Sequence, residues 1–197
     1  MAKLLTITQG DITIIPMENG ALVNPSNTGM ILGRGVSSQI TRRAGPFIQQ
    51  ALHMRRSSLP NNRLEPGHAV ATEAGQLPVK YLIHVSILGS KKINKRLISN
   101  CILSAYDLAD ELELNTLAFP PLGTLIAGFG LDEFLKLFWQ ITNEELPASE
   151  HLDQVILCLS SDAGFEQTAD FLEENFDSAH EQVEVDFRPG GIVPGML

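Results

Sequence analysis

Cysteines, aromatic residues and long apolar runs are all scarce in this sequence, and each scarcity argues against a class of protein. Two cysteines in 197 residues, Cys101 and Cys158, are too few for a disulfide-stabilised scaffold. Both lie in apolar stretches, which is typical of reduced core thiols. No apolar run approaches the ~20 residues of a membrane span. The first residues carry one lysine and few apolar side chains, so we expect no secretory signal, no membrane association and a cytoplasmic location.

Patterns typical of metal and nucleic-acid binding are missing as well. The five histidines and two cysteines form neither a CxxC pair nor a cluster with metal-ligand spacing, so we expect no metal and no cofactor. Aromatic residues make up 6% of the chain and are not interleaved with basic ones, as a base-stacking surface requires. A net charge of −9 also disfavours binding to a phosphate backbone, so we expect no nucleic-acid partner.

The negative net charge conceals an uneven distribution along the chain. Residues 1–96 carry 12 Lys and Arg against 4 Asp and Glu, whereas residues 97–197 carry 2 against 19. A basic segment raises the local concentration of anionic ligands. The first half of the chain therefore suits a ligand that bears phosphate.

The hydrophobic pattern predicts a single α/β domain. Short β-branched runs alternate with segments of helical periodicity, which favours a three-layer α/β/α fold around a central mixed, mostly parallel sheet. Strands are expected at 4–8, 11–15, 21–23, 68–72, 80–85, 115–119 and 154–159. Helices are expected at 36–54, with an interruption allowed at Gly45-Pro46, and at 93–112, 131–145 and 163–176. We expect one domain over residues 1–176 and a loose tail over 177–197, which is acidic and then rich in Gly and Pro.

A glycine loop in the first half of the chain has the order of an anion-binding element. The strand at 21–23 is followed by a polar turn at 24–27, a glycine-spaced loop at 29–35 and a helix. This order brings backbone N–H groups and a helix N-terminus beside a bound anion, and Gly33 and Gly35 can adopt φ > 0. An ordinary strand–helix connection has the same pattern, so the loop alone does not establish a site.

A second glycine loop, at 122–130, follows the expected strand at 115–119 and Pro120-Pro121. Both loops therefore lie at the carboxyl ends of strands, where ligands bind in open α/β sheets. His84 lies within an apolar strand. A histidine there is either a catalytic base or a packed, hydrogen-bonded residue, and we favour the packed residue.

Four segments in a fixed order carry a resemblance to a known family. They are Gly10–Thr13; Val23–Asn27 with Gly33–Val36 and Arg43–Pro46; Gly67–Thr72 with Leu77–His84; and Leu117–Thr124 ending in Gly128–Gly130. Together they resemble the macro domain family, which binds ADP-ribose. The resemblance extends over about residues 3 to 175 and implies ADP-ribose, free or on an ADP-ribosylated protein, as the partner.

The resemblance also implies a set of ligand-binding residues. Asp11, followed by Ile12, would accept a hydrogen bond from the adenine amino group. The alternative is that Asp11 caps the local backbone, and on the resemblance we favour the adenine contact. Asn27 would bind the hydroxyls of the distal ribose, and Phe129 would lie near that ribose. Two groups of residues would enclose the diphosphate: Gly35, Val36 and Ser37 on one side, and Gly123, Thr124, Leu125, Ile126, Ala127, Gly128 and Phe129 on the other.

The chain departs from the family pattern at several of these positions. Ser37 stands where many hydrolytic members have an aspartate, so an obvious general base is missing. Leu125 and Ala127 stand where glycines are common in the family. Their side chains would narrow the groove that binds the ligand. Ser160-Ser161 replaces an aromatic residue that some members place against adenine.

Three functions are compatible with these residues. The first, which we favour, is a module that binds ADP-ribose or a related ADP-ribosyl group. The second is a hydrolase of ADP-ribosyl esters, such as O-acetyl-ADP-ribose or mono-ADP-ribosylated protein. Its catalytic residues are unknown, and Asn27 is the best candidate. The third is an interaction module that has kept the fold without the ligand.

Overall fold

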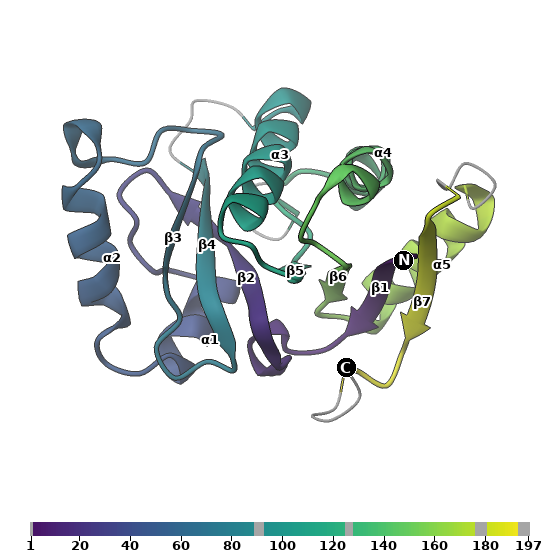
Figure 1. Cartoon of the computed structure of the whole chain (residues 1–197), viewed down its shortest axis with the longest axis horizontal. Helices are drawn as coiled ribbons and strands as arrows, with labels where there is room; N and C mark the ends of the chain where they lie inside the picture. The colour runs from purple at the N-terminus through teal and green to yellow at the C-terminus, as the bar shows by residue number, and fades with distance from the viewer. Residues whose placement is uncertain (1, 89–92, 125–127, 176–180, 193–197) are drawn as a thin grey trace.

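A sheet of seven strands runs through the middle of the computed structural model, which describes residues 2–88, 93–124, 128–175 and 181–192 (Figure 1). The strands are β1 Lys3–Gln9, β2 Met17–Asn27, β3 Ala69–Glu73, β4 Val79–Leu88, β5 Thr116–Phe119, β6 Gln154–Leu159 and β7 Val183–Arg188. The helices are α1 Val36–Arg43, α2 Ile48–Ser57, α3 Lys95–Glu111, α4 Leu131–Ala148 and α5 Asp162–Asn175, with short 3-10 helices η1 Ile12–Ile14 and η2 Pro60–Asn62.

The sheet is mixed and mostly parallel, as predicted. Its strand order is β3-β4-β2-β5-β6-β1-β7, and every neighbouring pair is parallel except β3 and β4. A connection of five residues, 74–78, joins β3 to β4. So short a link permits only an antiparallel pair, whereas parallel neighbours need a longer crossover.

Helices cover both faces of the sheet, so the predicted three layers are confirmed. One hydrophobic cluster joins the sheet to α3, α4 and α5, and a second joins the opposite face to η1, α1 and α2. Successive strand residues alternate between the clusters, so that Leu22 packs toward α1 and α2 and Val23 toward α3 and α4. Figure 1 shows α1 and α2 at one end of the molecule and α5 with β7 at the other.

Two local predictions near the first loop are wrong. The segment 11–15 is not a strand, because Asp11 caps the 3-10 helix η1 through its side chain. The segment 24–27 is not a turn, because β2 continues through Asn27 and pairs with β4. Asn24 and Ser26 are almost fully buried there, which polar residues tolerate when neighbouring groups satisfy them.

The expected helix at 36–54 is divided into α1 and α2 at the allowed interruption. Gly45, between them, has φ of 88°, a left-handed value that ends a helix. The other helices agree with prediction to within a few residues. The largest difference is α4, which continues past residue 145 and includes Pro147.

The prediction of a loose tail over 177–197 is wrong for Val183–Arg188. These residues form β7, which pairs in parallel with β1 along six residues from Lys3 to Thr8. Val183 is 5% exposed and belongs to the main hydrophobic cluster. The edge of β1 therefore satisfies its backbone groups with a segment distant in sequence.

Candidate functional site

A cleft of about 270 Å³ opens at the carboxyl ends of β1, β5 and β6, beside the beginning of α1. Eleven described residues line it: Gly10, Ile12, Gly35, Val36, Ser38, Gln39, Arg42, Pro120, Pro121, Cys158 and Ser160. This is the edge of the sheet where ligands of open α/β folds bind. Of the predicted ligand-binding residues, the cleft brings together Ile12, Gly35 and Val36.

The N-terminus of α1 opens into this cleft without a side-chain cap. Gly35 is the N-cap residue, with φ of 64° and ψ of −133°, and it offers no side chain to the first-turn N–H groups. A residue with a Cβ would be strained in this conformation. The backbone N–H groups of an uncapped first turn are available to an anion. Gly33, by contrast, is not in the left-handed region and does not line the cleft.

Ser37 points away from the cleft and into the interior. Its side chain is buried, and Oγ donates to Asn24 Oδ1 at 2.9 Å. The contribution of Ser37 to a bound anion is therefore limited to its backbone. A substitution here would act on the buried polar groups behind α1.

Asn24 continues this interaction to His84 and Thr72. Asn24 Nδ2 donates to His84 Nδ1 at 3.1 Å, and His84 Nε2 lies 2.9 Å from Thr72 Oγ1. Because an amide nitrogen only donates, we assign Nδ1 as the acceptor and place the ring proton on Nε2. Burial lowers the pKa of His84 to about 3, so the ring is neutral. The preferred prediction of a packed, hydrogen-bonded histidine is confirmed.

Asp11 has partners for both carboxylate oxygens. Oδ1 accepts from the backbone N and the hydroxyl of Thr13, and Oδ2 lies 3.1 Å from Arg43 Nε. Partial burial raises the pKa of Asp11, but the hydrogen bonds from Thr13 and the charge of Arg43 outweigh it and hold the pKa below its usual value. The capping alternative thus describes this residue. The adenine contact stays a prediction.

Asn27 is occupied within its own loop. Its Oδ1 accepts from the backbone N of Gly29 and of Ile31, and its Nδ2 donates to the Ile31 carbonyl at 2.7 Å. These bonds fold the chain around Met30, which has φ of 50°. Both ends of the amide stabilise the loop, and its predicted contact with the distal ribose is untested.

The second glycine loop is tightly turned where the structure describes it. Gly123 has φ of 80°, and a Cβ there would approach Ile98 and Phe129 at 3.2 and 3.3 Å. Gly128 has φ of 67°, and the Phe129 N–H donates to the Gly123 carbonyl. Thr124 donates its hydroxyl to the Pro121 carbonyl. Leu125, Ile126 and Ala127 lie outside the described residues.

Phe129 has a packing role in this loop. It is 7% exposed and belongs to the hydrophobic cluster beneath α3 and α4. An interior ring of this kind anchors the end of the loop. Its proximity to the distal ribose stays a prediction.

Comparison with known proteins assigns the family. A family model described as Macro domain matches residues 23–138. The chain belongs to the macro domain family. It is 29% identical over 177 residues to the macro domain-containing protein TTE0995 of Caldanaerobacter subterraneus subsp. tengcongensis, covering 88% of this chain and 98% of that protein.

Two further similarities concern an enzyme and a solved structure. An O-acetyl-ADP-ribose deacetylase of Cronobacter sakazakii is 27% identical over 84% of this chain and 91% of its own length. A variant of the Oceanobacillus iheyensis macrodomain with ADP-ribose superposes with a TM-score of 0.79 at 26% identity, covering 87% of this chain and 92% of that one. The structural likeness agrees with the three-layer fold.

Several cleft residues of this macro domain were missed from sequence. Ser38, Gln39 and Arg42 follow Gly35 at helical spacing of three, four and seven, so one face of α1 carries them all toward the cleft. That spacing was a usable signal. Ser160 was noted only as the replacement of an aromatic residue, and it does line the cleft.

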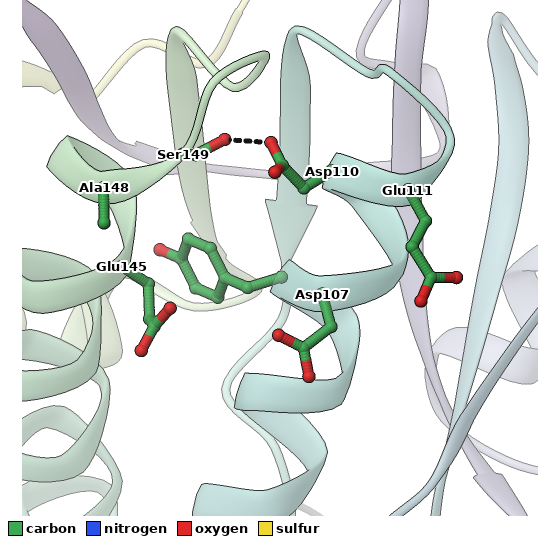
Figure 2. A pocket seen from close by; sticks show the side chains of 7 residues that line it. Asp107, Asp110, Glu111, Glu145, Ala148 and Ser149 are labelled. Atoms are coloured by element: carbon green, nitrogen blue, oxygen red, sulfur yellow. Dashed lines mark hydrogen bonds between the residues drawn. The ribbon is translucent and has the colours of Figure 1, made fainter.

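A separate, acidic groove of about 410 Å³ lies between the carboxyl-terminal halves of α3 and α4. Figure 2 shows Asp107, Asp110 and Glu111 projecting from α3 and Glu145 from α4, with Asp110 hydrogen-bonded to Ser149. Four carboxylates repel a diphosphate, so this groove is not the phosphate site.

Within the described ranges, no three or more His, Cys, Asp or Glu residues come together as a metal would require. No helix there is both long and apolar enough to span a bilayer.

Proposed function

We propose that this macro domain binds ADP-ribose, with the diphosphate against the first turn of α1. The observation that supports the proposal is the uncapped helix N-terminus at Gly35, which opens into a cleft at the carboxyl ends of the parallel strands. Backbone N–H groups and the helix dipole favour an anion at this position. Family membership and the similarity to a macrodomain with ADP-ribose support the same ligand.

The charge of the cleft supports the same ligand. Among its described lining residues, Arg42 is the one cation and there is no carboxylate. Burial raises the pKa of the Cys158 thiol to about 12, so this residue adds no negative charge at neutral pH. The cleft is therefore weakly positive in a chain whose net charge is −9.

Ester hydrolysis is the second candidate, and the name of the Cronobacter relative favours it. The described lining residues offer no carboxylate or histidine to activate water. The Ser37 hydroxyl is bonded to Asn24, and both ring nitrogens of His84 are occupied. A hydrolytic reaction here would depend on the substrate's own phosphate as base. We therefore favour binding over turnover.

The test is calorimetric titration with ADP-ribose, with ADP and ribose 5-phosphate as comparison ligands. We expect binding of ADP-ribose that Gly35→Val removes, because a β-branched residue is strained at φ of 64° and obstructs the first-turn N–H groups. Gly33→Val is the matched control, since a Cβ there meets nothing within 4 Å. Circular dichroism verifies that both variants fold.

Three outcomes separate the candidate functions. If ADP-ribose gives neither heat of binding nor a change in melting temperature, the proposal is contradicted. The remaining candidate is then an interaction module that does not bind the ligand. If Gly35→Val and Gly33→Val weaken ADP-ribose binding equally, the first turn of α1 is not part of the binding site. Release of acetate from O-acetyl-ADP-ribose, measured by chromatography, would establish the hydrolase instead of a simple binding module.

A further inference from the structure

A second hollow, of about 390 Å³, adjoins the cleft on the far side of η1 and Arg42. We call it the arginine hollow. Seven described residues line it: Thr13, Ile14, Arg42, Arg43, Gln76, Leu77 and Pro78. Arg42 lines both cavities, so its side chain forms part of the wall between them.

The arginine hollow has the chemistry of an anion site. Its lining holds two guanidinium groups, an amide and a hydroxyl, and no described lining residue is acidic. Arg43 bonds to Asp11 through Nε. The Arg42 side chain has no hydrogen bond or ion pair with the part of the chain that the structure describes. An unpaired guanidinium in a hollow favours a phosphate, which it can bind through two parallel hydrogen bonds.

The two cavities meet at the end of the cleft that is predicted to hold adenosine. Ile12 lines the cleft, and the next two residues of η1, Thr13 and Ile14, line the arginine hollow. Arg42 lies seven residues beyond Gly35, which is roughly 10 Å along a helix with a 1.5 Å rise per residue. A ligand with its diphosphate at Gly35 and its adenine toward Asp11 therefore has its adenosine end near Arg42.

We propose that the arginine hollow takes a phosphate carried on the adenosine ribose, so that this macro domain binds phospho-ADP-ribose more tightly than ADP-ribose. This inference rests on the proposed function, because it places ADP-ribose in the cleft. The recognised group is a phosphomonoester on the 2′ or the 3′ hydroxyl. Arg42 supplies the charge that pairs with it across the wall of the cleft.

The experiment compares calorimetric titrations with ADP-ribose and with 2′-phospho-ADP-ribose. We expect the phosphorylated ligand to bind about tenfold more tightly, because a new charge-assisted contact forms. In Arg42→Ala the ratio of the dissociation constants of ADP-ribose and 2′-phospho-ADP-ribose falls to about one. This holds whether or not the substitution also changes the affinity for ADP-ribose. Arg55→Ala is the matched control, since it removes the same charge from an exposed position on α2 that lines neither cavity, and it keeps the ratio.

Adenosine 2′,5′-bisphosphate and adenosine 3′,5′-bisphosphate, compared with AMP, form the second arm. Tighter binding of either bisphosphate that depends on Arg42 supports the proposal and identifies the hydroxyl. If ADP-ribose binds but no additional phosphate increases the affinity of any ligand, this inference is overturned and the proposed function stands. Failure of both ADP-ribose and phospho-ADP-ribose to bind overturns the proposed function and this inference with it.

Discussion

Single buried residues behind the first loop tie α1 to the sheet. Ser37 on α1, Asn24 on β2, His84 on β4 and Thr72 on β3 are joined by consecutive hydrogen bonds. Each satisfies the next, which is the condition under which buried polar groups do not destabilise a core. None of their side chains lines the cleft, so these hydrogen bonds hold the first turn of α1 in position from behind.

His84 makes folding dependent on pH. Its pKa is lowered to about 3 by burial, whereas the unfolded chain protonates near the ordinary 6.5. Below pH 6.5 the unfolded state therefore binds a proton that the folded state does not, and stability falls as pH decreases. We expect this residue to remove about 1.5 kcal/mol of unfolding free energy between pH 6.5 and pH 5.

Urea unfolding at both pH values measures this effect. His84→Gln should lose less stability than the wild type over the interval, by about that amount. His53→Gln, at an exposed position on α2, is the matched control and should behave as the wild type. The same pH dependence in wild type and His84→Gln would mean that His84 is protonated in the folded state.

At the scale of elements, α3 and α4 pack through their apolar faces and bring acidic groups together beside that contact. Tyr106 on α3 donates to Thr142 on α4 at 2.9 Å within the buried interface. At the rim, burial and the charges of Asp107 and Glu144 raise the pKa of Glu145. The packing of α3 against α4 therefore holds the Glu145 carboxylate where burial and neighbouring negative charges destabilise its ionised form.

Glu145→Gln should stabilise the protein at neutral pH. Because the folded-state pKa is raised, the ionised form costs stability above that pKa, and the cost disappears as pH falls below the unfolded value. We expect a melting temperature about 1–2 °C higher at pH 7 and no gain at pH 4, a small effect because the group is partly solvated. Glu150→Gln, at an exposed position, is the charge-matched control. An equal gain in both variants would indicate a general charge effect.

At the scale of the whole molecule, a C-terminal segment completes the sheet that the N-terminal strand begins. β7 pairs with β1, and β1 pairs on its other side with β6, so the edge of the sheet joins both ends of the described chain. The charged residues are also divided between the two halves of the chain. The basic first half provides α1, which lines the cleft, and α2, whereas the acidic second half provides α4 and α5 (Figure 1). We expect this division of charge to favour approach of an anionic ligand to the α1 side of the cleft.

Val183→Ala should lower the unfolding free energy by about 1–3 kcal/mol, because it removes two methyl groups from the core. Glu184→Ala, at the next and exposed position of β7, should change it little. Thermal or urea unfolding measures both. A negligible effect of Val183→Ala would mean that β7 separates from β1 in solution and that the tail is loose after all.

Much of the fold and part of the site were predictable from local patterns. Hydrophobic periodicity located the strand at 154–159 and the helix at 93–112, and the glycine at 35 marked a turn that requires φ > 0. Strand–helix alternation predicted the layers, since parallel strands need helical crossovers. The cleft at the strand ends follows from the same rule.

The sequence by itself determined the class of fold and the left-handed turn at Gly35, because each depends on residues close together in the chain. It also carried the family resemblance, through four short segments in a fixed order. Only the tertiary structure decided where side chains point and which distant segments meet. Ser37 turns inward because Asn24 accepts its hydroxyl, and Arg42 reaches two cavities because η1 packs beside α1. β7 becomes a strand because β1 offers an unpaired edge. Such partners lie far apart in sequence, and no local pattern records them.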